Sequence, residues 1–353
     1  MDTCLRYHPS SPDRASGAGE RPWTASRILA QGASMSDIAV LSNPASGNNR
    51  TRARRDLQAL TRSRGIDHLQ PARLREVPNA LRTLAARNTR VLAIDGGDGT
   101  VVAVVTALRR HKPFTREPIL AVLSGGSTNM IARDAGCPGA PAAALARLLK
   151  HWDTADGQLP IVTRRPLLVR SAGAPPSYGF FLGGVGIPRV TAAARRGLYA
   201  RGIAGPLAWS LALIWSLWRL ACGGLKTTPL LRPADVRIAC NDSPGATAPR
   251  IAVIVTSLDR LLLGLRPVSP GEGVGVAVIN AHVPGLWRRA PSALWRPWPS
   301  FTAIEAKPFA ACRCRSVALS ATEDWVLDGE PLDSPADATL TVQSDSSLRF
   351  VMA

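Results

Sequence analysis

The chain has 353 residues and carries 43 Lys+Arg against 25 Asp+Glu, which gives a formal net charge of +18. Its hydrophobic content of 46% excludes wholesale disorder, and the composition also excludes a polytopic membrane protein. The six cysteines are scattered, with no CxxC pair and no zinc-finger spacing, which excludes a disulfide scaffold. We therefore interpret them as reduced, small apolar residues.

The first 36 residues differ from the rest of the chain. They contain Pro, Ser and Gly without apolar periodicity, and they lack the apolar segment of a signal peptide. Two interpretations fit residues 1–36: a disordered extension, or a mis-assigned start with translation beginning at Met35.

Apolar strands alternate with helical segments between residues 37 and 156, which predicts a parallel sheet covered by helices. The strands are expected at Ile38–Leu41, Val91–Ile94 and Ile119–Leu123. The helices are expected at residues 51–64, 100–110, from about 129, and 142–149. Because the strands are continuously apolar, we expect both faces of the sheet to be buried.

The pattern changes to many short strands between residues 157 and 353, interrupted by one long helical stretch at about 190–221. The strands are expected at residues 160–170, 178–182, 236–240, 251–256, 274–281, 317–321 and 340–343. This spacing predicts a β-rich, sandwich-like C-terminal domain, whose last strands could pack back on the first domain.

Three glycine-rich turns follow the three strands of the first domain. They are NPASGN (residues 43–48), DGGDGT (95–100) and SGGSTN (124–129). In a right-handed βαβ array these turns share the carboxyl edge of the sheet, where ligands bind. Glycine allows positive φ angles and close approach, and successive N–H groups form an anion nest. Together they predict a polyphosphate ligand, although no P-loop or GxGxxG motif is present.

Asp98 lies between two glycines in the second turn. A carboxylate beside bound phosphates would be repelled unless it holds Mg²⁺, takes up a proton or orders the loop. A helix-capping role is an alternative, since Asp at a helix start accepts backbone N–H bonds. Asp95 is expected to be the structural member of the pair.

The three turns, in this order, resemble those of the diacylglycerol kinase catalytic-domain family, which includes bacterial lipid kinases and sphingosine kinases. The segment LDGE at residues 327–330 resembles the late Asp-Gly-Glu turn of that family. The resemblance covers residues 37–353 and implies an ATP-binding α/β domain followed by a β-rich lipid-binding domain. The GGDGT motif is also shared with NAD kinases.

The resemblance implies roles for individual residues. Asp328 would deprotonate the lipid hydroxyl, although sphingosine kinases assign that role to the position of Asp98. Glu330 and Asp98 would hold Mg²⁺. The nucleotide would be bound by Asn43, Ser46, Gly47, Gly96, Gly97, Gly99, Thr100, Gly125, Gly126, Ser127, Thr128 and Asn129.

Several positions depart from the family pattern. Val102 and Ala103 stand where the family commonly has Asn-Glu, and Met130 stands where it commonly has Asp. Asn48 replaces the usual Lys of the first turn. Nucleotide binding is still expected, but the loss of acidic residues leaves the metal arrangement and turnover open.

Two tryptophan-rich stretches lie in the second half of the chain. They are residues 202–218, with Trp209, Trp215 and Trp218, and residues 287–298, with Arg288, Arg289 and Arg296. The first is uncharged but shorter than a membrane span and contains Pro206. Aromatic anchors beside cations predict docking to an anionic membrane surface, with ordinary core packing as the alternative.

The function expected is an ATP-dependent lipid kinase that phosphorylates a hydroxyl of diacylglycerol, a sphingoid base or another membrane lipid. ATP is the expected co-substrate, Mg²⁺ the cofactor, and the location cytoplasmic and peripheral to the membrane. A homodimer is left open, and no nucleic-acid partner is expected, because no recognition motif accompanies the scattered Arg residues. The alternatives are an NAD kinase-like enzyme and a non-catalytic nucleotide- or lipid-binding module.

Overall fold

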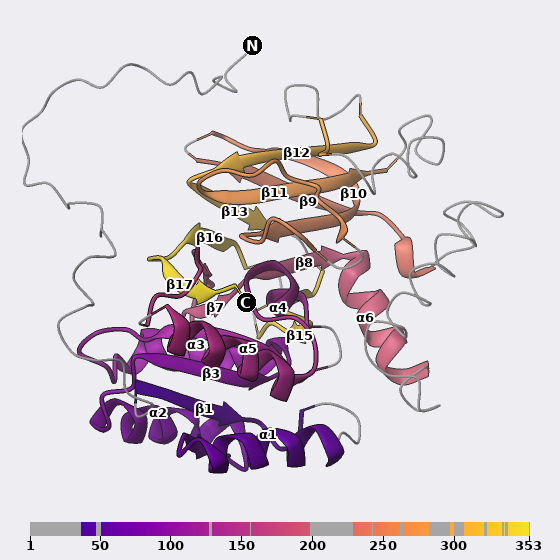
Figure 1. Ribbon diagram of the computed structural model, residues 1–353. Helices are drawn as coiled ribbons and strands as arrows, with labels where there is room; N and C mark the ends of the chain where they lie inside the picture. Colours follow the sequence, from indigo (N-terminus) through magenta and orange to yellow (C-terminus); the bar gives the residue numbers. More distant parts are fainter. Residues whose placement is uncertain are drawn as a thin grey trace, which may run out of the picture.

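The computed structural model describes most of the chain (Figure 1). The described residues are 37–46, 51–126, 129–155, 157–197, 229–241, 243–261, 264–281, 297–299, 307–320, 323–333, 335 and 338–352. The interpretations of residues 1–36 and the tryptophan-rich stretch 202–218 lie outside this part. So do Arg288, Arg289 and Arg296.

A mainly parallel six-stranded sheet forms the first domain. Its order is β2 (Asp67–Leu69), β1 (Ile38–Ser42), β3 (Val91–Gly96), β4 (Ile119–Ser124), β17 (Leu348–Val351) and β5 (Ile161–Arg164). The first four strands are parallel, β17 runs parallel to β4, and β5 is antiparallel to β17. The expected burial of both faces is confirmed, since every residue of β1 is buried.

Helices cover both faces of this sheet, as Figure 1 shows. They are α1 (Thr51–Ser63), α2 (Val77–Ala86), α3 (Asp98–His111), α4 (Met130–Ala135) and α5 (Pro141–Thr154). Ala39 and Leu41 pack in one core cluster with residues of α2 and α3, whereas Ile38 and Val40 pack in another with residues of α1 and α5. The alternation of neighbouring apolar residues along β1 therefore builds two cores.

An antiparallel eleven-stranded sheet forms the β-rich domain. Its main path is β15 (Glu330–Pro331), β14 (Trp325–Leu327), β8 (Phe181–Val185), β10 (Ala246–Thr256), β9 (Ala234–Cys240), β13 (Ser316–Ser320), β16 (Leu340–Ser344), β6 (Leu167–Arg170) and β7 (Ser177–Gly179). Off this path, β11 (Val274–Asn280) joins β10 to β12 (Phe309–Cys314). The predicted fold class, an α/β domain followed by a β-rich domain, is confirmed.

Two predicted strands are in fact pairs of strands. Residues 160–170 divide into β5 and β6, which lie in different sheets. Arg165 and Pro166 separate them, because proline has no N–H to donate to a ladder. Residues 178–182 likewise divide between β7 and β8 at Phe180.

The long helical stretch expected at 190–221 is described only as α6 (Gly186–Gly197), which starts earlier than predicted. The remainder of that stretch lies outside the described residues. Within them, none of the helices is both long and apolar enough to cross a bilayer.

The two domains share apolar and ionic contacts. Phe180 of the β-rich domain packs edge-on against Phe350 of β17, with ring centroids 6.1 Å apart, and both side chains are fully buried. Arg164 of β5 lies between Asp134 of α4 and Asp259 of the β-rich domain, at 2.8 and 3.0 Å. β5 and β17 complete the first sheet, although both follow residue 156 in the chain. The domain boundaries remain predictions.

Candidate nucleotide-binding site

The three glycine-rich turns meet at one edge of the first sheet. They follow β1, β3 and β4, which are adjacent and parallel, so their carboxyl ends lie side by side. This arrangement is the one expected from the sequence. Gly47, Ser127 and Thr128 lie outside the described residues, and the other predicted nucleotide-binding residues can be placed.

Two side chains of the first turn hold the turns together. The Ser46 hydroxyl accepts the Gly97 N–H at 2.8 Å and donates to the Gly125 carbonyl at 3.4 Å. The Asn43 amide donates to the Thr100 hydroxyl at 2.9 Å. Ser46 therefore bridges all three turns, and Asn43 links the first turn to the start of α3.

Glycine in the second and third turns permits contact between backbones. A Cβ atom on Gly126 would lie 2.2 Å from the Cα of Gly97, and one on Gly125 would lie 2.2 Å from Oδ1 of Asp95. None of the described glycines at positions 96, 97, 99, 125 and 126 has a positive φ. The expectation that they supply left-handed backbone is therefore wrong, because what they supply is close approach.

Asp95 has the structural role expected of it. Its Oδ2 accepts a hydrogen bond from the Ser42 hydroxyl at 2.9 Å, at the end of β1. The Asn43 N–H also donates to the Asp95 carbonyl, at 2.9 Å. Asp95 thereby joins two strand ends below the turns.

Asp98 begins α3, and its buried carboxylate caps a different helix. Its Oδ2 and Oδ1 accept the N–H groups of Met130 and Ile131, at 3.1 and 2.9 Å. These are the first residues of α4, whose N–H groups have no partner within the helix. Burial raises the pKa of Asp98, and the two hydrogen bonds and Arg133 oppose that shift. Of the predicted roles, this geometry provides helix capping, although the helix capped is α4 and not α3, and the cap also orders the loop.

Asn129 closes the third turn on itself. Its side-chain oxygen accepts the Gly126 N–H and its amide nitrogen donates to the Gly126 carbonyl, both at 2.8 Å. The residue has a φ of 50°, a left-handed conformation that Asn tolerates better than most residues. Its side chain therefore orders the turn, and direct contact with a nucleotide remains a prediction.

Asp328 and Gly329 form the two-residue turn between β14 and β15. Both have positive φ, 50° and 88°, which suits a type I′ hairpin and the Asp-Gly sequence. The structural alternative for this pair, a hairpin turn, is thus confirmed as its local conformation. Because β14 pairs with β8, the turn lies beside Phe180 and Phe181.

The carboxylate of Asp328 is enclosed by the backbone of residues 179–181, where β7 ends and β8 begins, although part of the residue remains exposed. It accepts the N–H groups of Phe180 and Phe181, at 2.9 and 3.1 Å. A Cβ on Gly179 would lie 2.3 Å from its Oδ2. Burial raises the pKa of Asp328 to about 8, the charge of Asp98 adds to the rise, and the two hydrogen bonds oppose it. The charge of Asp98, in the first domain, thus acts on the pKa of Asp328 in the second.

Glu330 is exposed, whereas the residues that replace acids common in the family are buried or half-buried. Glu330, the predicted magnesium ligand, is an exposed residue of β15. Met130 is buried in the core, and Val102 packs against that core. Met130 stands where the family commonly has Asp, so that acidic position is occupied by a packed apolar side chain. Val102 stands where the family commonly has Asn, and Ala103, where it commonly has Glu, is half-buried.

The sequence did not reveal the partners that position these acids. Tertiary structure places the amides of Phe180 and Phe181 beside Asp328. It also places the Arg164 side chain, which holds α4 through Asp134.

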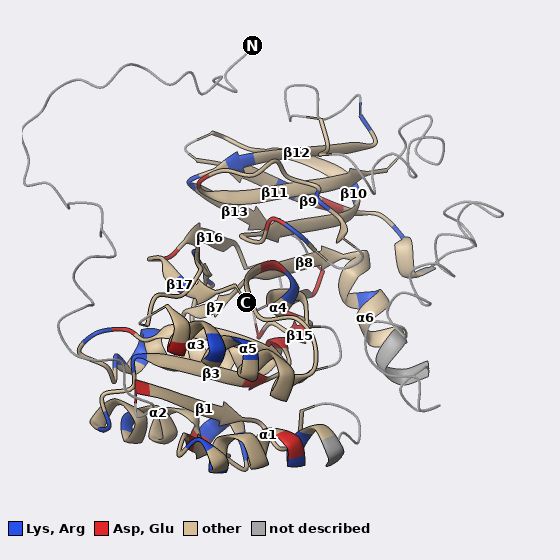
Figure 2. Ribbon diagram, viewed as in Figure 1, with Lys and Arg blue, Asp and Glu red and all other residues tan. Residues whose placement is uncertain are grey.

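Lys and Arg residues are spread over both domains rather than gathered on one element (Figure 2). A cavity of about 390 Å³ lined by Arg109, at the far end of α3 from Asp98, is separate from the turns.

Comparison with known proteins confirms the resemblance for the first domain. Residues 37–157 match the family model of the diacylglycerol kinase catalytic domain. No curated protein matches the chain in sequence. The matched residues include the three turns described above.

Solved structures extend the likeness to the second domain. One, described as a diacylglycerol kinase from Bacillus anthracis str. Sterne, aligns with a TM-score of 0.57 and 13% identity over 90% of this chain and 96% of that chain. Two others, assigned provisionally to the same activity in the same organism, give TM-scores of 0.60 and 0.61 at 14% identity. They cover 90% of this chain and 97% and 96% of their own. At such identity the likeness establishes the fold alone.

Two glycine variants test the packing of the turns. Gly126→Ala places a methyl group into the Gly97 backbone, so we expect it to lower the free energy of unfolding by about 2 kcal/mol or more. A Cβ on Gly99 meets nothing within 4 Å, so Gly99→Ala should leave stability unchanged or slightly higher. Urea unfolding of both variants measures the difference, and equal stabilities would contradict the packing described here.

The pH dependence of stability tests the surroundings of Asp328. Its pKa of about 8 exceeds the ordinary value of 3.8, so the folded state binds more protons between these values. Its contribution to stability is therefore complete below pH 4 and is lost as the pH rises through 8. The free energy of unfolding of Asp328→Asn should rise relative to wild type between pH 5 and pH 9. The exposed Asp333→Asn is the control, and parallel curves for Asp328→Asn and wild type would contradict the assignment.

Proposed function

We propose that the protein is an ATP-dependent kinase that transfers the γ-phosphate of ATP to a hydroxyl of a membrane lipid. One observation carries the proposal: three turns of a kinase-family domain converge at one edge, and Asp328 of the other domain is electrostatically coupled to Asp98 among them. The match to the diacylglycerol kinase catalytic domain supports the class of reaction.

The backbone of the turns supplies donors for the triphosphate. α3 begins at Asp98, and its first intrahelical hydrogen bonds run from the N–H groups of Thr100 and Val101 to the Gly97 carbonyl. The N–H groups of Asp98 and Gly99 precede these bonds and therefore point out of the N-terminal end of the helix. The start of a helix attracts anions through such N–H groups and through the helix dipole. Open space beside Gly99 leaves room for a phosphate to approach that backbone.

Asp328 is suited to activate the acceptor. In the proposed reaction the lipid hydroxyl oxygen forms a bond to the γ-phosphorus, the bond to the bridging oxygen of ADP breaks, and the hydroxyl proton passes to Asp328. A general base is most effective when its pKa lies near the working pH, and burial brings that of Asp328 to about 8. Asp98 contributes indirectly, by ordering α4 and by its charge.

Two carboxylates of the site, those of Glu330 and Asp98, are candidate ligands for Mg²⁺. The exposed carboxylate of Glu330 has the hard oxygen chemistry that Mg²⁺ prefers, and such sites need only one or two carboxylates besides phosphate oxygens. Each oxygen of Asp98 already accepts an N–H group, which leaves lone pairs for a cation but makes ordering its primary task. Glu330 and Asp98 would hold the ion, which neutralises charge on the triphosphate.

The lipid acceptor and the membrane contact are proposed from the charge of the chain, its tryptophan-rich stretches and its family match. The basic charge of the chain, its tryptophan-rich stretches and the lipid kinase family of its first domain favour an acceptor at an anionic membrane surface. We propose peripheral binding there, in the cytoplasm, with diacylglycerol and sphingoid bases as the first acceptors to test.

A second function is favoured by one specific observation. Met130 is buried where the family commonly has Asp, and the half-buried Ala103 stands where it commonly has Glu. A chain that binds ATP without transferring phosphate would show this pattern, so a non-catalytic nucleotide- or lipid-binding module is the alternative.

Transfer of radiolabelled γ-phosphate from ATP to a total-lipid extract tests the proposal. We expect a labelled lipid with wild-type protein, a loss of about 10²–10⁴-fold with Asp328→Asn, and little change with the exposed control Asp333→Asn. Label on added NAD would instead identify an NAD kinase-like enzyme. ATP binding without any labelled product would support the non-catalytic module.

A further inference from the structure

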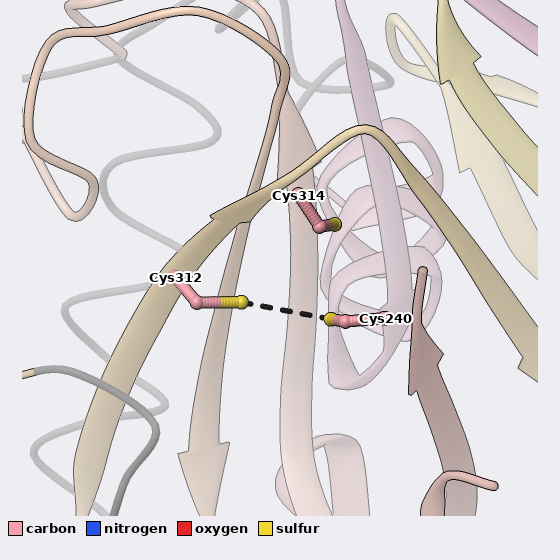
Figure 3. A group of neighbouring side chains, drawn as sticks. All are labelled: Cys240, Cys312 and Cys314. Carbon is pink, nitrogen blue, oxygen red and sulfur yellow. Dashed lines mark hydrogen bonds between the residues drawn. The ribbon is translucent and has the colours of Figure 1, made fainter. Parts of the chain in front are cut away.

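Three cysteines converge in the β-rich domain, away from the glycine-rich turns. Cys240 ends β9, and Cys312 and Cys314 lie on β12. Their sulfur atoms all lie within 4.8 Å of one another, and those of Cys240 and Cys312 are 3.6 Å apart. Figure 3 shows Cys240 and Cys312 pointing toward one another, with Cys314 beside them. The interpretation of these cysteines as scattered apolar residues is therefore incomplete.

The topology of the second sheet explains the convergence. β9 and β12 are not paired with each other, but both connect to β10, β9 directly and β12 through β11. Residues two apart on a strand share a face, so Cys312 and Cys314 point the same way. Cys314 belongs to the apolar core that also includes residues of β9. The three thiols thus meet where two strands face one another.

The spacing of the sulfur atoms suits a thiophilic cation. A tetrahedral ion with sulfur ligands at about 2.3 Å holds those sulfurs roughly 3.8 Å apart. The Cys240–Cys312 separation of 3.6 Å is close to that value, and the other two are at most 4.8 Å, so side-chain movements of about 1 Å would allow coordination. Thiolate sulfur selects soft or borderline d¹⁰ ions, and zinc sites with three protein ligands keep one position for water.

A buried arginine supplies a second, independent observation. Arg250 of β10 is fully buried, and one of its terminal nitrogens donates to Oδ1 of Asn280 at 2.8 Å. Its Nε and other terminal nitrogen have no acceptor among the described residues, and its strand is paired with β9, which ends in Cys240. A buried cation requires a nearby negative charge.

Charge balance distinguishes the states of the cluster. Three protonated thiols are neutral, and a disulfide between Cys240 and Cys312 would also be neutral, so neither compensates Arg250. A divalent cation bound to three thiolates has a net charge of −1. Such a complex would supply the negative charge that this region lacks.

We propose that Cys240, Cys312 and Cys314 bind one thiophilic d¹⁰ cation, of which Zn²⁺ is the representative. Binding breaks three S–H bonds, forms three metal–sulfur bonds and releases three protons to solvent, with no change of oxidation state. The ion would join β9 to β12 and stabilise the β-rich domain. This site is independent of the proposed kinase reaction.

Zinc titration of the reduced, full-length protein tests the site. Cys4 and Cys222, outside the described residues, are first replaced by Ser, so that Cys137 is the remaining cysteine outside the cluster. After removal of metal by a chelator, we expect one Zn²⁺ per chain in competition with a chromophoric chelator. The midpoint of thermal unfolding should rise with zinc, because the ion binds the folded state.

Matched cysteine variants locate the ion. Cys312→Ser should lose stoichiometric zinc binding and its thermal shift, whereas Cys137→Ser, a buried cysteine of the first domain, should keep both. Co²⁺ added to the protein with the cluster intact should produce thiolate-to-metal charge-transfer absorption, a readout that does not depend on the folding of a variant.

Three results would overturn the proposal. One is a folded, reduced protein with the cluster intact that binds no zinc. Another is equal zinc binding by Cys312→Ser and Cys137→Ser. The third is a Cys240–Cys312 disulfide that persists under mild reductant while zinc fails to bind, which would identify a redox pair instead.

Discussion

Close contact between two backbones organises the first domain and the candidate site. Gly97 and Gly126 approach so nearly that Gly126 has no room for a side chain, and the Ser46 hydroxyl bonds to Gly97 and Gly125 across the same junction. The adjacent strand ends make this contact possible, since β1, β3 and β4 are neighbours. The N–H groups of Gly97 and Gly126 are used within this junction, by Ser46 and Asn129, so the proposed donors to a triphosphate are the N–H groups at the start of α3.

The acids of the site depend on the same junction. Asp98 can cap α4 only because the second and third turns lie together, and its charge then acts on Asp328. Asp328 in turn is held by the amides at the start of β8, while Phe180 packs against Phe350 of the first sheet. An acid whose burial raises its pKa costs stability at alkaline pH, and the same burial suits it to accept a proton.

The sequence predicted the parts of the fold that rest on apolar pattern and turn chemistry. The continuous apolar runs of β1, β3 and β4 and the glycine-rich turns after them indicated the parallel sheet and its functional edge. β2 was missed because its three residues, Asp67–Leu69, are polar or half-buried at the sheet edge. β14 was missed because three residues are too few for a periodicity.

Tertiary contacts account for what the sequence could not supply. No local pattern shows that Asp98 caps α4, or that the N–H groups of Phe180 and Phe181 hold Asp328. The role of Asp328 was predicted only through the resemblance to a family, whereas its hairpin conformation was predicted from the Asp-Gly pair itself. The meeting of Cys240 with Cys312 and Cys314 joins strands that are 72 residues apart, so spacing rules for metal sites could not detect it.

The central claim is that the three turns hold the triphosphate of ATP. Amide hydrogen exchange, measured with and without a non-hydrolysable ATP analogue, tests it most directly. The account predicts slower exchange at the first turn of α3 and at the turns after β1 and β4, with no change in β9 and β12. Bound analogue that leaves exchange at these turns unaltered, or slows it only in the β-rich domain, would contradict the account.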